Sequence, residues 1–83
     1  MSNAELKQLA DAGQRIYESR LQSHLERSHP NEFVAIEPES GDYFLGQTLT
    51  DAMTDARKAY PQRKAYAVRV GHKCAIEIGG MSR

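Results

Sequence analysis

Apolar residues in the first third of the chain recur at intervals of three and four residues, or sums of these, which is the period of an α-helix. The members of this set are Leu6, Leu9, Ile16, Tyr17, Leu21 and Leu25. The pattern predicts one amphipathic helix from about residue 3 to residue 28, which the segment His29-Pro30-Asn31 ends. Because glycine destabilises a helix interior by about 1 kcal/mol relative to alanine, we expect Gly13 to mark a bend or a close crossing.

Beyond residue 31 the pattern changes to alternation between apolar and polar positions, with many residues that favour strands. Residues 32–37 and 42–46 are predicted to pair as a hairpin. The turn between them contains Pro38, which ends a ladder of hydrogen bonds, and Gly41, which accepts a positive φ. On the alternating pattern Glu37 lies on the side of the first strand that is expected to face water.

A second helix is predicted over residues 48–60, because Thr48 has the side chain of an N-cap and Pro61 stops the apolar stripe that follows it. Residues 65–70 and 74–78 then alternate again and are predicted to be two more strands. The element order is therefore α-β-β-α-β-β. This order predicts the α+β class, with a long N-terminal helix plus a four-stranded sheet that has one helix packed on a face.

The chain divides on this pattern into an N-terminal amphipathic helix (residues 1–30), a ββαββ domain (31–80) and a short tail (81–83). A protein of 83 residues buries only about 60 to 65% of its unfolded surface, so the core is expected to be thin. We expect the residues on the apolar side of each local period to form it. They are Val34, Ile36, Phe44, Leu49, Met53, Ala56, Val68, Val70, Ile76 and Ile78.

Charge is balanced over the whole chain, with 11 basic and 11 acidic residues, but it is unevenly distributed. Residues 31–55 carry only acidic charges, whereas residues 56–83 carry basic charges against Glu77 alone. The basic residues interleave with Tyr60 and Tyr66, a composition that suits a phosphate backbone and stacked bases. The residues assigned to this nucleic-acid contact are Arg57, Lys58, Arg63, Lys64, Arg69 and Lys73, and we expect charge reversal at Arg63 and Lys64 to leave folding intact.

The single cysteine, Cys74, rules out a disulfide within the chain and favours a cytoplasmic protein. No apolar run approaches the roughly 20 residues of a membrane span, so no membrane partner is predicted. Cys74 and His72 with another histidine do not make the paired ligand spacing of a metal site, and Cys74 in an apolar alternation is more typical of a core residue. The sequence thus predicts no catalytic residue, no metal and no cofactor.

Two resemblances are carried by residues 33–80. The segment from Phe33 through Gly41-Asp42 to the helix beginning at Thr48 is similar to the N-terminal domain of HicB-type antitoxins, although Gln47 stands where that family has an acidic residue. A longer pattern, which continues to Tyr60-Pro61 and Arg69-Val70-Gly71, resembles a family of small uncharacterised bacterial and archaeal proteins. The first resemblance implies an antitoxin that binds and blocks a small ribonuclease.

From these patterns we expect a non-enzymatic protein-binding or regulatory module, antitoxin-like in its partner; the alternative is a nucleic-acid-binding module that uses the basic last third. We also expect a homodimer. A 25-residue helix is about 37 Å long at 1.5 Å per residue, longer than a small four-stranded sheet can cover. The predicted partner interface is therefore the apolar stripe of that helix, with a helix that folds back onto its own domain as the alternative. Its residues are Leu6, Leu9, Ile16, Tyr17, Leu21 and Leu25.

Overall fold

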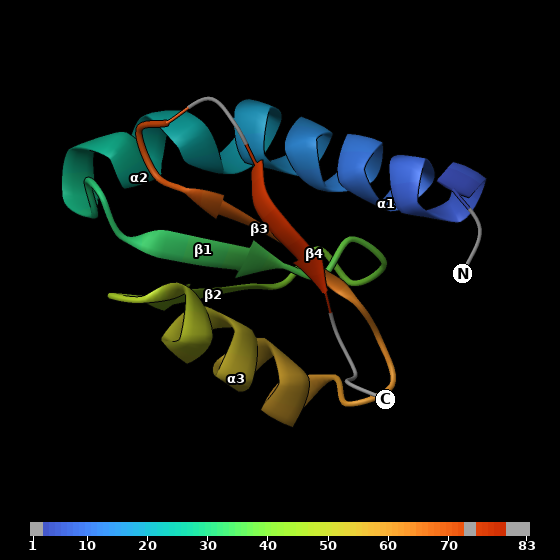
Figure 1. Cartoon of the computed structure of the whole chain (residues 1–83). Helices are drawn as coiled ribbons and strands as arrows, with labels where there is room; N and C mark the ends of the chain where they lie inside the picture. The colour runs from blue at the N-terminus through green and yellow to red at the C-terminus, as the bar shows by residue number, and fades with distance from the viewer. Residues whose placement is uncertain (1–2, 73–74, 80–83) are drawn as a thin grey trace.

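The computed structural model describes residues 3–72 and 75–79, with the backbone alone for residues 3, 6 and 75–79 (Figure 1). The helices are α1 (Asn3–Ile16), α2 (Gln22–Ser28) and α3 (Leu49–Ala59), with a π-helical turn, η1 (Tyr17–Leu21), between the first two. The strands are β1 (Phe33–Ile36), β2 (Tyr43–Gly46), β3 (Ala65–Arg69) and β4 (Ala75–Gly79). The α+β class predicted from the sequence is confirmed.

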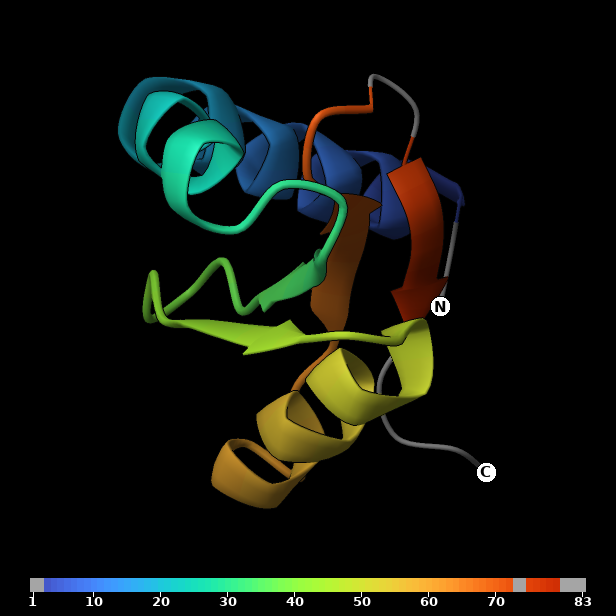
Figure 2. The same cartoon turned by 90° about the vertical axis from the view of Figure 1, so that its left-hand side faces the viewer.

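The strands pair in the order β2-β1-β3-β4, and every pairing is antiparallel (Figure 2). β1 is central: Val34 pairs with Leu45 of β2 on one side and with Val68 of β3 on the other. The first two strands form the predicted hairpin, in which Gly41 has the expected positive φ of 81°. The chain then leaves β2, forms α3 and returns on the far side of β1 as β3. The second edge of β1 therefore pairs with a segment distant in sequence.

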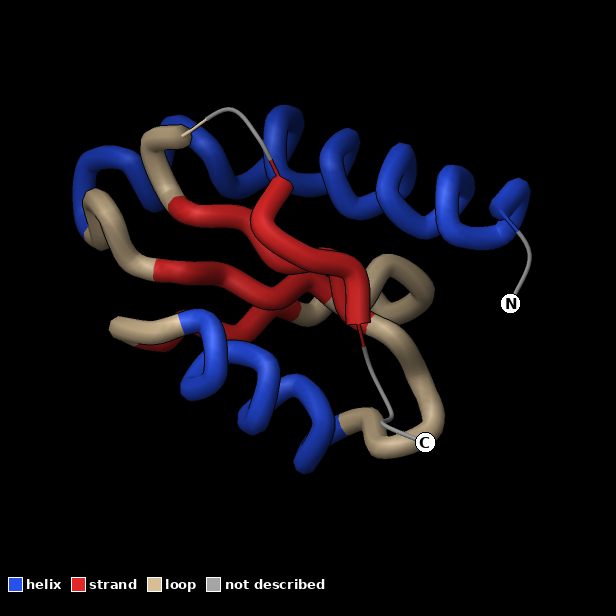
Figure 3. Tube along the Cα trace, viewed as in Figure 1, coloured by secondary structure: helices blue, strands red, loops and turns tan. Residues whose placement is uncertain are grey.

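α1, η1 and α2 lie on one face of the sheet as one continuous helical segment, and α3 lies on the opposite face (Figure 3). The sheet thus has a helix on each face, whereas the sequence predicted a single covering helix. The first face is packed with large side chains. They are Tyr17, Leu21, Leu25, Val34, Ile36, Tyr66, Val68 and Val70, all buried.

Gly13 is a point of close approach between α1 and the sheet. A Cβ atom built at this position would lie 2.5 Å from the Cβ atom of Tyr66 on β3, a distance that real side chains do not adopt. Of the two expectations for Gly13, the close crossing is therefore confirmed. The irregular turn comes later, at η1, where Tyr17 and Leu21 are both buried against the sheet.

The face under α3 is built from small side chains. Ala35, Ala52, Ala56 and Ala65 are buried there, and Phe33, Phe44 and Met53 pack around them while partly exposed. Thr48 caps α3 as predicted, since its side chain accepts a hydrogen bond of 3.1 Å from the backbone N–H of Asp51. The last turn closes at Tyr60, directly before Pro61.

Half of the predicted core is confirmed as buried: Val34, Ile36, Ala56, Val68 and Val70. Phe44, Leu49 and Met53 are half-buried because they lie at the rim of the smaller face, and the side chains of Ile76 and Ile78 lie outside the described residues. The prediction for Glu37 is wrong. Its side chain is only 2% exposed, because the face that was expected to be wet is covered by α3 and the loop that follows it.

Candidate functional site

A groove lies between the first turns of α1 and the turn that joins β1 to β2. Its volume is about 390 Å³, and its lining consists of Glu5, Gln8, Leu9, Ala12, Pro38 and Glu39. Leu9 and Ala12 are half-buried on the helix, while Glu39 is exposed on the turn. The groove therefore combines apolar side chains with a carboxylate on each of its two walls, a composition suited to a ligand that is both apolar and basic.

Behind this turn, Glu37 is buried and held by four groups of the same region. Its Oε1 atom accepts hydrogen bonds from the backbone N–H of Ser40, at 2.8 Å, and from Nη1 of Arg63, at 3.1 Å. Its Oε2 atom accepts from the backbone N–H of Glu39 at 3.1 Å, and the Ser40 hydroxyl adds a further interaction. The carboxylate thus fixes the conformation of the turn that forms one wall of the groove.

The pKa of Glu37 lies below its ordinary value of 4.5. Burial by itself raises the pKa of this carboxyl, but the hydrogen bonds from Ser40, Glu39 and Arg63 together outweigh burial. Glu37 is therefore ionised at neutral pH and forms a salt bridge with Arg63. The desolvation of this buried charge offsets much of its attraction to the arginine, so the ion pair adds little net stability. Its main effect is to fix the conformation of the turn.

Arg63 extends this polar cluster to the end of α3. Its guanidinium carbon lies 5.5 Å from the centre of the Tyr60 ring, and the Tyr60 hydroxyl donates a hydrogen bond to Asp42 at the start of β2. The Tyr60 ring also contacts Phe44 edge-on, with 6.2 Å between ring centres. The loop after α3 is thereby fastened to both ends of the β1–β2 turn.

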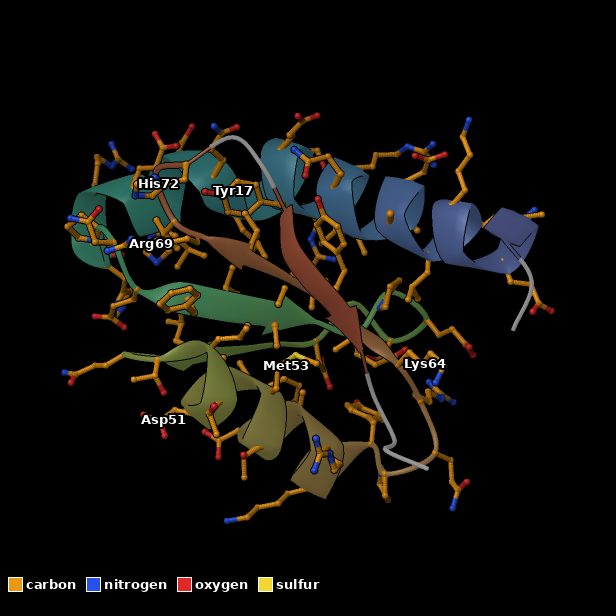
Figure 4. All side chains as sticks on the ribbon, in the orientation of Figure 1. Tyr17, Asp51, Met53, Lys64, Arg69 and His72 are labelled. Carbon is orange, nitrogen blue, oxygen red and sulfur yellow. The ribbon has the colours of Figure 1, made fainter. Side chains whose placement is uncertain are left out.

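The basic residues predicted to contact nucleic acid do not form one surface. Lys64 and Arg69 lie at opposite ends of the sheet (Figure 4), and Arg63 is engaged by Glu37. Arg69 lies over the Phe33 ring at 5.6 Å and donates from Nε to the carbonyl of Asn31. Arg57 and Lys58 are exposed on α3, and Lys73 lies outside the described residues.

This placement also corrects the expectation that Arg63 can be reversed in charge without effect. A glutamate at this position, where the arginine side chain is 41% exposed, would remove the cation that pairs with buried Glu37 and place a second negative charge beside it, which is unfavourable. Sequence distance hides the pair, because 26 residues separate Glu37 from Arg63. The sequence signal for the role of Glu37 was an acidic residue directly before a turn that contains a proline, because the backbone N–H groups of such a turn can donate to a carboxylate.

The predicted partner interface is divided by the fold. Tyr17, Leu21 and Leu25 are at most 5% exposed within the chain itself, so their assignment to a partner is wrong. They lie in the core because the helical segment folds onto its own sheet, the alternative that the length argument left open. Leu9 and Ile16 remain half-buried, and the side chain of Leu6 lies outside the described residues.

The pKa of the Tyr17 hydroxyl is raised, mainly by burial. A hydrogen bond with the backbone of Gly71 lowers this pKa, and the negative charge of Glu26 raises it. The Gly71 N–H donates to that hydroxyl at 3.4 Å. Near it, His72 contacts Asn31 and His29 contacts Glu32, each at 3.3 Å. Within the described residues, no group of three or more His, Cys, Asp or Glu side chains is arranged to hold a metal ion.

Comparisons with known proteins give no relative for this chain: no family model, no curated protein and no solved structure matches it. The two resemblances of the sequence therefore stay expectations. Among the residues that the structure describes, no helix is both long and apolar enough to cross a membrane.

Proposed function

We propose that this protein is a non-enzymatic binding module that captures a basic protein partner in the groove between α1 and the β1–β2 turn. The observation that supports this function best is the lining of the groove. Leu9, Ala12 and Pro38 offer apolar contact, and Glu5 and Glu39 place a carboxylate on each wall. A partner segment that presents an apolar side chain next to lysine or arginine complements both features.

The rigidity of the turn supports the same proposal. Glu37 holds the backbone of Glu39 and Ser40 in place, and Arg63 ties that unit to the loop after α3. A wall that is ordered before binding loses little conformational entropy when a partner arrives. The groove is thus suited to recognition, with a defined shape that a partner can match.

The antitoxin-like form of the proposal follows from charge. Small ribonuclease toxins act on a polyanion, and a surface that binds a polyanion is itself basic. An acidic-walled groove on a regulatory partner would cover such a surface and block it. In this proposal the module acts in the cytoplasm, as its single cysteine favours, and its sheet acts as a four-stranded unit.

The test uses the chain as bait in extracts of the cells that produce it, against a matched bait with Leu9→Arg and Glu39→Lys. Lys58→Glu, exposed on α3, is the control bait. We expect a basic protein to be retained by the parent and the control and lost from the groove variant, and the purified partner should then bind the parent and the control directly but not the groove variant. Equal retention by all three baits would refute the groove, and no partner enriched over an unrelated bait would refute protein binding.

The alternative, nucleic-acid binding, is supported by the exposed pair Arg57 and Lys58 near the end of α3. Two aromatic faces that would stack on bases are instead covered by arginines, Tyr60 by Arg63 and Phe33 by Arg69. A gel retardation assay at low salt with single- and double-stranded RNA and DNA distinguishes the two functions. A shift that Arg57→Glu with Lys58→Glu abolishes would favour the alternative.

Self-association belongs to the proposal as well, and we propose a homodimer. The core is small, and on β2 Tyr43 is exposed while Phe44 and Leu45 are only half-buried in the single chain. Burying such residues against a second copy contributes up to about 1.5 to 3 kcal/mol for each side chain fully removed from water. Sedimentation over a wide concentration range tests this, and a monomer mass at high micromolar concentration would refute it.

A further inference from the structure

β2 is the outer strand on one side of the described sheet, with β1 as its one neighbour (Figure 2). It pairs with β1 in a regular register, from Phe33 opposite Gly46 to Ile36 opposite Tyr43. Tyr43 is the exposed large hydrophobic residue of the described chain, at 37%. An apolar, exposed strand at a sheet edge presents backbone donors and acceptors that another strand can use.

The direction of those backbone groups follows from the ladder. The N–H of Glu37 donates to the carbonyl of Asp42 at 2.8 Å, so these two residues form a hydrogen-bonded pair just beyond the strand ends. Hydrogen-bonded pairs recur at every second residue of an antiparallel ladder, which makes Phe44 and Gly46 the next residues of β2 that bond to β1. Tyr43 and Leu45 therefore direct their N–H and carbonyl groups outward, away from β1.

These outward groups have no partner from other segments within the part of the chain that is described. Natural proteins commonly protect such an edge with a lysine, a proline or a bulge. The sequence Tyr43-Phe44-Leu45-Gly46 contains no charged residue and no proline, and its pairing with β1 has no bulge. The edge is short, at four residues, but it has none of these three features that prevent pairing with another strand.

We propose that β2 of a second copy pairs antiparallel with β2 across a twofold axis at Phe44, joining the two sheets into one. This inference rests on the homodimer of the proposed function and names its interface. The register places Tyr43 of each copy opposite Leu45 of the other. Both residues have outward backbone groups, so the two pairs exchange four hydrogen bonds, while Phe44 meets its own copy at a closely spaced, non-hydrogen-bonded position.

The side chains match in this register. Tyr43 and Leu45 pair with Ile36 and Val34 of β1, so they project to the face of α1, and there each exposed tyrosine covers a half-buried leucine of the other copy. Phe44 projects to the α3 face and gives an aromatic pair on the axis. A twofold axis normal to the sheet keeps each face on its own side, as this pairing requires. The edge is neutral and therefore has no charge with which to repel its own copy.

A second copy is favoured over other occupants because the strand complements itself. An unrelated strand could bond to the same outward backbone groups, but it would not place a leucine opposite Tyr43 and a tyrosine opposite Leu45. The groove between α1 and the β1–β2 turn is lined by other residues, so this edge pairing and the proposed partner contact different surfaces.

Amide hydrogen exchange of the unmodified chain tests the interface. In a monomer, the amides of Tyr43 and Leu45 point to solvent and exchange quickly, whereas those of Phe44 and Gly46 are protected by β1. We expect the Tyr43 and Leu45 amides to slow by about tenfold or more as concentration converts monomer to dimer. A dimer without this slowing would overturn the edge pairing and leave the homodimer itself standing; a persistent monomer would overturn both, and neither result bears on the groove.

A variant gives a second, independent measurement. Tyr43→Lys places a cation at the edge, as proteins do to block strand pairing, and its matched control is Ser23→Lys on the exposed side of α2. We expect a monomer mass for Tyr43→Lys with an unchanged circular dichroism spectrum, and a dimer for the control. A Tyr43→Lys protein that still forms the dimer would refute the interface, and the exchange measurement decides the question if the variant fails to fold.

Discussion

The two faces of the sheet are built on different principles. Beneath α1, η1 and α2, eight buried side chains that include two tyrosines and two leucines interlock, and a glycine brings the helix into contact. Beneath α3, alanines carry the contact, and the face ends in the ion pair between buried Glu37 and partly exposed Arg63. Stability should therefore reside mainly in the first face, and precise positioning of the β1–β2 turn in the second. Substitutions on the two faces test this division.

The largest effect is expected from Val68→Asp on β3. Val68 is 1% exposed on the α1 face, and an unpaired carboxylate there costs several kcal/mol, a large share of the stability of a small domain. We expect a chain that is unfolded by circular dichroism at 25 °C. Thr50→Asp, at an exposed position in the first turn of α3, is the control and should keep its melting temperature; a cooperative melt of Val68→Asp near that of the parent would contradict the assignment of this face.

The two faces are compared directly by truncating one large residue on each. Leu25 is fully buried, so Leu25→Ala should lower the free energy of unfolding by about 2 to 5 kcal/mol. Met53 is half-buried beneath α3, and Met53→Ala should cost about half of that or less, because fewer contacts are lost. Urea unfolding measures both. Equal losses would mean that the α3 face contributes as much as the α1 face.

Gly13→Ala tests the close crossing. Alanine favours a helix by about 1 kcal/mol over glycine, but here its methyl group would overlap Tyr66, and overpacking costs about 1 to 3 kcal/mol. We expect a net destabilisation of up to about 2 kcal/mol by urea unfolding. Gly13→Ala with Tyr66→Gly, which removes the Cβ atom as well as the ring, should show strong coupling in a double-mutant cycle, whereas additive effects would place the glycine away from β3.

The smallest effect is expected at the ion pair. Glu37→Gln keeps an acceptor for the turn but loses the charge, so we expect a loss of about 1 kcal/mol at pH 7. The pKa of Glu37 is lower in the folded chain than its ordinary value of 4.5. The ionised carboxylate therefore adds to the free energy of unfolding above pH 4.5, and this contribution is lost as the pH falls below 4.5 and through the pKa of the folded chain. The difference between parent and variant should thus shrink at pH 3. Glu39 also lies 3.8 Å from Arg63, so the control is Asp55→Asn, exposed on α3. A constant difference between parent and Glu37→Gln at all pH values would contradict the ionised pair.

Local patterns were sufficient to predict the positions of the helices and most strands. The helical period from residue 3 to 28, the Thr48 cap, the Pro61 stop and the alternation at residues 65–70 are all properties of neighbouring residues. Gly13 was also recognised, since a glycine inside a helical pattern calls for an explanation. Interactions between residues close in sequence thus determine where the helices and strands of this chain lie.

What could not be predicted depends on which element covers which face. Alternation places Glu37 on the side of Ala35 but does not tell whether that side meets water or α3. In the same way, the helix period shows that Tyr17, Leu21 and Leu25 need a partner without saying that the chain's own sheet supplies it. The strand order, with β3 beside β1, decides both questions, and it is set by contacts distant in sequence.

The position of the N-terminal helix on β3 has a consequence for how the chain is made. Residues 3–28 leave the ribosome before β3, yet Gln14 bonds to Tyr66, which follows it by 52 residues. At a synthesis rate of about 5 to 20 residues per second, the apolar stripe of that helix waits roughly 3 to 10 seconds for its binding surface. During that interval, Tyr17, Leu21 and Leu25 lack the sheet against which they are buried in the folded chain, so we expect chaperones that bind exposed apolar segments to bind the nascent chain.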